Sequence, residues 1–146
     1  MNERSQRLVE LSRDQCFDHL RRAGIGRIGY VVEGLAVILP VNFTMRDDDI
    51  VFCTDSGSKL RWLSNHTRVA FEVDGSNAED QSGWSVLVRG TARSVTDADS
   101  IEALGAEDVV SWVRPAAAHW VRISVDQVSG RSLAAAERPT TTAPPP

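Results

Sequence analysis

The chain has 146 residues, of which 42% are hydrophobic and 25% charged, so it can bury one substantial core and we expect a single domain. A net charge of −4 and a pI near 5.3 argue against a nucleic-acid surface, which is ordinarily basic. No apolar run approaches the roughly 20 residues that cross a bilayer, and the polar start of the chain is unlike a signal peptide. We therefore expect a cytoplasmic protein that binds neither nucleic acid nor membrane.

The first predicted element is an amphipathic helix over residues 11–24. Ser12 and Gln15 have the spacing of a capping box, Phe17 belongs to its apolar face, and Gly24 is a typical helix stop. A second helix is predicted over residues 96–104, because hydroxyl and acidic residues crowd its start.

Strand-like runs rich in Val, Ile, Tyr and Phe occupy most of the remaining chain. Gly90 falls inside the longest of them and predicts a bulge or a close backbone approach. A polar loop is expected over residues 75–83 and a brief helix over residues 60–63. The pattern predicts six strands, over residues 26–32, 35–43, 50–54, 68–74, 84–95 and 119–125.

Strands joined mostly by hairpins, with two or three short helices between them, predict a mainly β (α+β) fold, an antiparallel β-barrel. The βαβ rhythm and GxGxxG fingerprint of a dinucleotide-binding fold are absent from the sequence. We expect residues 1–133 to form the domain and residues 134–146, an Ala/Pro/Thr-rich tail, to be disordered.

One turn has the composition of a phosphate site. The chain contains fifteen arginines but a single lysine, Lys59, which follows Gly57 and Ser58 after a predicted strand that ends at Thr54. Gly57 permits close backbone approach, Ser58 can cap a helix, and the free N–H groups of a first helical turn favour an anion. The same residues also suit an ordinary solvated turn, and the Walker spacing is missing.

The cysteines and histidines do not predict a metal site. Cys16 and Cys53 are too few and too far apart for a metal or disulfide framework. His19, His66 and His119 have neither HxxxH nor HExxH spacing. We therefore expect no bound metal, and neither His66, Cys53 nor Arg27 is assigned a catalytic role, so the catalytic residues stay unknown.

Several short segments recur in one order along the chain: GRIG at 26–29, LPVNF at 39–43, VFCT at 51–54, GSKL at 57–60, VAFEVD at 69–74 and GWSVLVRGTA at 83–92. Together they resemble the pyridoxamine 5′-phosphate oxidase-like, FMN-binding split-barrel family, over roughly residues 8–131. The resemblance implies a six-stranded split barrel, FMN as cofactor, and a homodimer that holds each flavin at the subunit interface. By motif, Thr54, Ser58 and Lys59 would hold the FMN phosphate.

The resemblance also implies contacts with the rest of the flavin. Trp84 and Ser85 would reach it from the other subunit. Simpler readings stay open, because Phe43 can be a core residue, Pro40 an edge-strand residue and Trp84 a dimer anchor. The strand expected along the isoalloxazine and ribityl chain contains Pro40, Val41, Asn42 and Phe43.

The implied activity is an FMN-dependent oxidoreductase that reduces a small oxidised compound such as a quinone or nitro compound. Pyridoxamine phosphate is a poor expected substrate, because Arg131 alone stands where the vitamin oxidase has a basic, histidine-bearing motif. Two alternatives stay open. One is a flavin carrier or sensor without turnover, and the other is a deazaflavin-dependent reductase, for which Arg61 and Arg68 are candidate cations.

Overall fold

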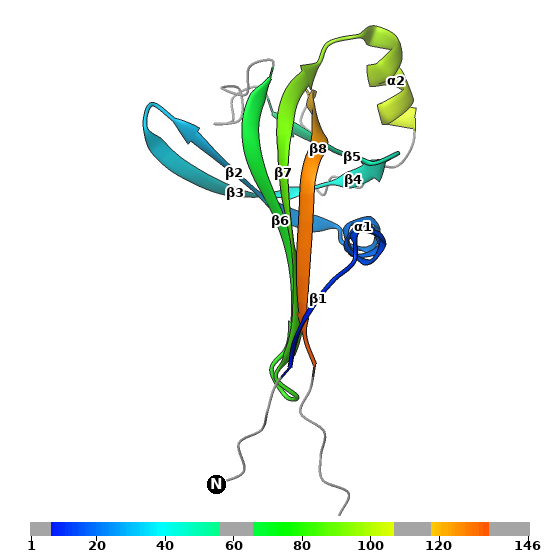
Figure 1. Ribbon diagram of the computed structural model, residues 1–146. Coiled ribbons are helices and arrows are strands. Elements are labelled where there is room, and N and C mark those ends of the chain that lie inside the picture. The colour runs from blue at the N-terminus through cyan, green and yellow to red at the C-terminus, as the bar shows by residue number, and fades with distance from the viewer. Residues whose placement is uncertain (1–6, 56–65, 107–117, 135–146) are drawn as a thin grey trace, which may run out of the picture.

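The computed structural model describes residues 7–55, 66–106 and 118–134, which form one curved antiparallel sheet and two helices (Figure 1). Neither helix in these ranges is long and apolar enough to cross a membrane. The elements are β1 (Leu8–Glu10), α1 (Arg13–Arg22), β2 (Ile25–Val32), β3 (Leu35–Asn42), β4 (Thr44–Arg46), β5 (Asp49–Asp55), β6 (Thr67–Asn77), β7 (Ser82–Val95), α2 (Ala98–Ala106) and β8 (Ala118–Leu133).

The strand order is β3-β2-β6-β7-β8-β5-β4, with β1 paired to β8, and β3 returns to contact β5. In Figure 1 the sheet is curved, and the β2–β3 and β4–β5 hairpins extend to opposite sides of the long central strands. The mainly β, antiparallel split-barrel class is therefore confirmed. The predicted number of six strands is wrong, because the described residues alone form a sheet of eight.

The two strands that the sequence did not predict are β1 and β4, each three residues long. Segments this short show no clear alternation, so their strand character comes from pairing with distant residues. Leu8 pairs with Leu133 at the far end of the chain. Thr44 pairs with Val51 across a turn at Asp47, whose φ is +53°.

The predicted polar loop over residues 75–83 is the end of a long hairpin. β6 and β7 stay paired as far as Asn77 and Ser82. Side chains close the turn, since Asn77 accepts a hydrogen bond from the Glu79 N–H at 3.0 Å and Asp80 accepts one from the Ser82 N–H at 3.0 Å. A strand pair that is exposed to solvent can carry polar residues on both faces. The alternation of apolar and polar residues that predicts a strand is therefore missing from this segment.

Helix α1 begins with the predicted capping box. The Ser12 hydroxyl accepts from the Gln15 N–H at 3.2 Å, and the Gln15 side chain accepts from the Ser12 N–H at 2.8 Å. Its buried face carries Cys16, Phe17 and Leu20 and packs against β8, β4 and β7. In α2, Asp97 caps the first turn by accepting from the Ser100 N–H at 2.9 Å. The helix predicted over 60–63 lies outside the described residues.

The core fills the barrel between the sheet and α1. Phe71 of β6 is fully buried and meets Phe43 edge to face, with ring centroids 4.9 Å apart at 76°. A second, smaller cluster beneath α2 contains Val51, Leu104 and Trp120. The largest fully buried side chains are Phe52, Phe71, Leu20, Ile28, Ile50 and Ile123, followed by five valines. These apolar side chains fix which face of each strand points outward.

Gly90 occupies the bulge that the sequence predicts. The β7–β8 register shifts between Arg89 and Gly90, and a Cβ at Gly90 would overlap the carbonyl oxygen of Ser124. We expect Gly90→Ala to lower the free energy of unfolding by roughly 1–3 kcal/mol, because a backbone carbonyl in a ladder cannot rotate away. Urea denaturation measures the loss. Gly24→Ala is the control, since nothing lies within 4 Å of its Cβ position, and an equal loss in both variants would contradict the explanation.

Candidate functional site

Four neighbouring strands, β3, β2, β6 and β7, present one continuous face away from the core, which we call the outer face. Side chains alternate along each strand, so every second residue points outward. The pairing registers place these residues in rows across the strands. The outer face contains Ala36, Ile38, Pro40 and Asn42 of β3, Ile25, Arg27, Gly29 and Val31 of β2, Arg68, Ala70, Glu72 and Asp74 of β6, and Ser85, Leu87, Arg89 and Thr91 of β7.

The strand predicted to follow the flavin divides between two faces. Pro40 is exposed and Asn42 half-buried on the outer face. Val41 packs against the core, and Phe43 is a core residue in contact with Phe71. β3 stands at the end of the strand order, so one edge of its backbone has no strand partner in the described chain. The cofactor contact of these four residues stays a prediction.

Thr54 is the only member of the predicted phosphate turn that the structure describes, since Ser58 and Lys59 lie outside the described residues. It is half-buried near the end of β5 and pairs with His119 of β8. The His119 ring is 2.9 Å from the Ser94 hydroxyl of β7. Thr54, His119 and Ser94 thus form a polar row that the sequence does not predict, because Thr54 and its strand partner His119 are 65 positions apart.

Trp84 and Ser85 are neighbours in sequence but point to opposite faces of β7. Ser85 is exposed on the outer face, where its strand partners are Asp74 and Arg131. Trp84 is half-buried and stacks on His19 of α1, with ring centroids 3.9 Å apart and planes inclined by 18°. This pair borders a cleft of about 590 Å³ beside the turn end of the β6–β7 hairpin. The flavin contact predicted for both residues stays untested.

We expect His19 to make the stability of the fold depend on pH. Partial burial lowers the pKa of His19 below its ordinary value, Arg22 lowers it further, and Asp18 opposes the shift. The unfolded chain therefore takes up the proton first as the pH falls through about 6.5. We expect the neutral His19 side chain to contribute fully to the free energy of unfolding above that pH, and this contribution to decrease as the pH falls below it. Urea unfolding at pH 7.5 and 5.5 measures this loss, which should be larger in the parent protein than in His19→Gln, and an equal loss would contradict it.

Arg27 lies beside Pro40 in the strand register, but its charge is compensated. Its guanidinium is 3.1 Å from Glu72 and 3.2 Å from Asp74, and these two carboxylates raise its pKa, with Asp74 the stronger influence. Because all three side chains are substantially exposed, the pairs position the arginine more than they stabilise the fold.

The other residues considered for chemistry are dispersed. Cys53 packs against the small cluster beneath α2, His66 is exposed at a φ of +70°, and Arg131 is exposed on β8. Within residues 7–55, 66–106 and 118–134, no group of three His, Cys, Asp or Glu side chains could hold a metal ion.

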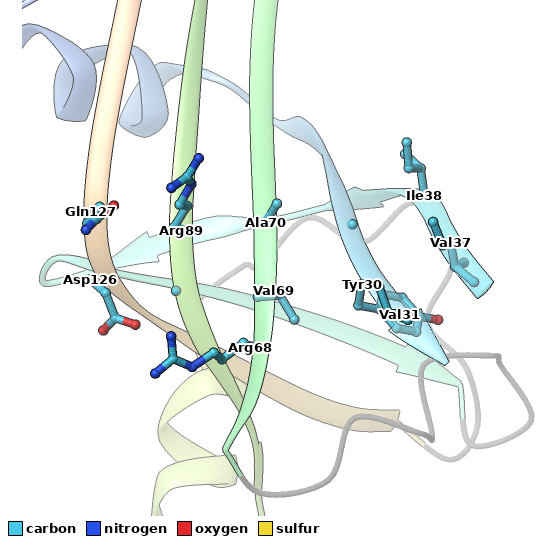
Figure 2. A pocket seen from close by; sticks show the side chains of 13 residues that line it. Tyr30, Val31, Val37, Ile38, Arg68, Val69, Ala70, Arg89, Asp126 and Gln127 are labelled. Carbon is cyan, nitrogen blue, oxygen red and sulfur yellow. The ribbon is translucent and has the colours of Figure 1, made fainter. Parts of the chain in front are cut away.

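The outer face contains a groove of about 750 Å³ that the sequence did not predict (Figure 2). Its floor is made by Gly29 and Ala70, which pair across β2 and β6. Ile38 borders it on the β3 side, and Arg68 and Arg89 border it on the side of β6 and β7. No segment of the sequence contains this combination, because five strands contribute to the lining, β2, β3, β6, β7 and β8.

Comparisons with known proteins give matches that cover most of the chain. The family described as pyridoxamine 5′-phosphate oxidase matches residues 12–132. The solved structure of the FAD binding protein from Mycobacterium smegmatis has 34% identity and a TM-score of 0.75, covering 86% of this chain and 98% of that one.

Two further proteins extend the comparison. The Mycobacterium tuberculosis protein Rv0080 is 28% identical over 139 residues, which cover 92% of this chain and 91% of that protein. An FAD-binding protein from Mesorhizobium loti has a TM-score of 0.73 at 23% identity, covering 86% of this chain and 97% of that one, and supports the fold alone.

Proposed function

Because the chain belongs to the pyridoxamine 5′-phosphate oxidase family, we propose that it binds a flavin nucleotide and uses it to reduce a small oxidised compound. The family match over residues 12–132 carries this proposal, since it spans β3, Thr54 and the segment with Ser58 and Lys59. The Mycobacterium smegmatis FAD binding protein, 34% identical over nearly its whole length, supports a flavin in particular.

The exposed edge of β3 suits a flavin ring. An edge strand offers unpaired N–H and C=O groups, and the isoalloxazine ring has donors and acceptors along one of its own edges. Pro40 adds an apolar side chain and Asn42 an amide on the outer face next to that edge. The residues present therefore fit the cofactor's ring, while Thr54, Ser58 and Lys59 are proposed to hold its phosphate.

The cofactor supplies the redox chemistry when bound, so the task of this chain is binding and orientation. The barrel core fixes β3 through Phe43 and Phe71, which limits movement of the proposed ring site. Glu72 and Asp74 hold Arg27 on the face next to Pro40. We assign no residue as acid or base, and we do not propose pyridoxamine phosphate as the substrate.

The identity of the nucleotide is a separate question. The resemblance to FMN-binding split barrels favours FMN, whereas the name of the Mycobacterium smegmatis protein favours FAD as the second candidate. A deazaflavin is the third. Acid release of the bound cofactor, followed by chromatography against the three standards, identifies it directly.

Turnover tests the proposed activity against a carrier or sensor role. The flavin-loaded protein is mixed with NADH or NADPH and then with a quinone or a nitro compound. We expect the absorbance of the bound flavin to fall with the donor and to recover repeatedly with the acceptor. A flavin that stays bound but never cycles would support the carrier role instead.

We also propose a homodimer with the flavin at the interface. Apolar side chains on the β2–β3 hairpin support it: Val31, 65% exposed, and Ile38, 72% exposed, are diagonal neighbours on its outer face, and Leu35, 72% exposed, lies beside the turn. Exposed apolar groups that lie together mark association surfaces. Leu35→Asp should shift the dimer to monomer in sedimentation experiments, by at least tenfold in Kd. A stable monomer that retains its flavin would contradict the two-subunit site.

A further inference from the structure

The two arginines of the groove, Arg68 and Arg89, differ from the arginines of the fold that form ion pairs. Arg21, Arg27 and Arg122 each have a carboxylate oxygen within 3.1 Å. Arg68 and Arg89 are exposed, and neither guanidinium has a hydrogen-bonding or ionic partner anywhere in the part of the chain that the structure describes. Arg93 and Arg131 likewise have no such partner among the described residues, so what distinguishes Arg68 and Arg89 is that both line one groove.

The two arginines are placed to reach one anion. Ala70 pairs with Arg89 and Arg68 pairs with Thr91, so the arginines are diagonal neighbours on adjacent strands. Such neighbours have Cα atoms roughly 7–8 Å apart. Figure 2 shows the two side chains pointing in different directions, so a shared anion requires at least one of them to change rotamer. Asp126 also lines the groove and accepts a hydrogen bond from Thr91 at 3.0 Å. Two arginines and one aspartate leave a positive balance there.

Most of the remaining lining is apolar. The floor between β2 and β6 is made by small residues, since a Cβ at Gly29 would lie 3.8 Å from the methyl of Ala70, an ordinary van der Waals contact. Ile38 and Val31 form the opposite border (Figure 2). From β3 to β7 the groove crosses three strand spacings, roughly 14 Å. This width suits one or two fused rings with an anionic group at one end.

We propose that the groove binds a compound with a flat apolar body and one carboxylate or phosphate, which Arg68 and Arg89 hold together. Its role rests on the proposed function: Ile38 precedes Pro40 on the outer face of β3, so the compound lies beside the residues proposed to contact the cofactor. We assign the anion to the oxidised substrate, because Thr54, Ser58 and Lys59 are proposed to hold the flavin phosphate; a cofactor phosphate in the groove is the competing outcome of the test. In both cases the recognition is the same, a guanidinium pair on an anion above an apolar floor.

The test compares 4-nitrobenzoate with neutral 4-nitrobenzamide. Both are titrated calorimetrically into the full chain as purified, at low salt and without an electron donor. We expect the carboxylate to bind at least tenfold more tightly than the amide. Arg68→Ala with Arg89→Ala should weaken the carboxylate by roughly tenfold or more and the amide little, because charge-assisted hydrogen bonds are lost.

Two variants control for charge. Arg93→Ala removes a cation from the same strand, outside the groove lining, and should leave the affinity for 4-nitrobenzoate nearly unchanged. Arg68→Lys with Arg89→Lys keeps both charges and should retain part of the affinity. If Arg93→Ala weakens binding as much as the double alanine variant, general electrostatics explains the effect and the site is overturned.

The flavin content of each variant separates the two sources of the anion. Loss of 4-nitrobenzoate affinity with unchanged flavin content supports a substrate site, and loss of both supports the cofactor's phosphate. If the protein never binds flavin but still binds 4-nitrobenzoate through the two arginines, the groove is supported and the proposed function is refuted. If the protein binds flavin but neither arginine substitution changes its affinity for 4-nitrobenzoate, only the proposed groove site is refuted. Failure of the probe to bind, together with dissociation of a dimer in the double variant, would assign the arginines to an interface between copies.

Discussion

Phe71→Ala is expected to lower the free energy of unfolding by about 3–5 kcal/mol. Phe71 is fully buried, and its ring supports Phe43 at the end of the proposed cofactor strand. Removing the ring leaves a cavity between β2, β3 and β6, so the variant should also release bound flavin at a lower urea concentration than the parent. Equilibrium unfolding followed by circular dichroism measures the stability, and flavin fluorescence measures the release. A loss below about 1 kcal/mol would show that this contact does not hold the barrel together.

Gly26 provides the partner for a double-mutant cycle. A Cβ at Gly26 would overlap the ring of Phe71, so Gly26→Ala alone should cost roughly 1–3 kcal/mol. In the Phe71→Ala background the added methyl enters the emptied space, and its cost should largely disappear. Costs that simply add, within about 0.5 kcal/mol, would contradict the packing described for this pair.

Lys59→Ala combined with Ser58→Ala should weaken FMN binding by about 2–4 kcal/mol, or roughly 30- to 1000-fold. The reason is that the cation and the hydroxyl are proposed to contact only the phosphate. Riboflavin, which lacks the phosphate, should lose far less affinity. Fluorescence quenching of each flavin by the apoprotein gives both dissociation constants under one set of conditions.

Arg61→Ala controls for the charge removed in that experiment, because it deletes a neighbouring cation that has no proposed phosphate contact. It should change FMN affinity by less than about threefold, and the small effect should vanish in high salt. Equal losses for FMN and riboflavin in the Lys59 and Ser58 double variant would remove the phosphate assignment.

The features that the sequence predicted correctly depend on residues close together in the chain. The capping box of Ser12 and Gln15 needs only residues three apart, and it forms as expected. Glu33 and Gly34 close the β2–β3 hairpin with φ angles of +49° and +77°, a conformation that glycine favours. The bulge at Gly90 likewise follows from one residue type within one strand.

The features that sequence reasoning missed depend on distant pairing. β1 exists because Leu8 meets Leu133, and no pattern within three residues contains that information. The stacking of His19 on Trp84 requires α1 to cross the long hairpin. The groove needs a glycine on β2 beside an alanine on β6, which only the register reveals.

The most direct measurement of the central claim is the flavin content of the purified chain. The protein is mixed with excess FMN or FAD and desalted, and its visible absorption spectrum and protein concentration are recorded. We predict a yellow protein with the two visible bands of an oxidised flavin and about one flavin per chain. A colourless protein that also fails to quench the fluorescence of added FMN or FAD would contradict the claim.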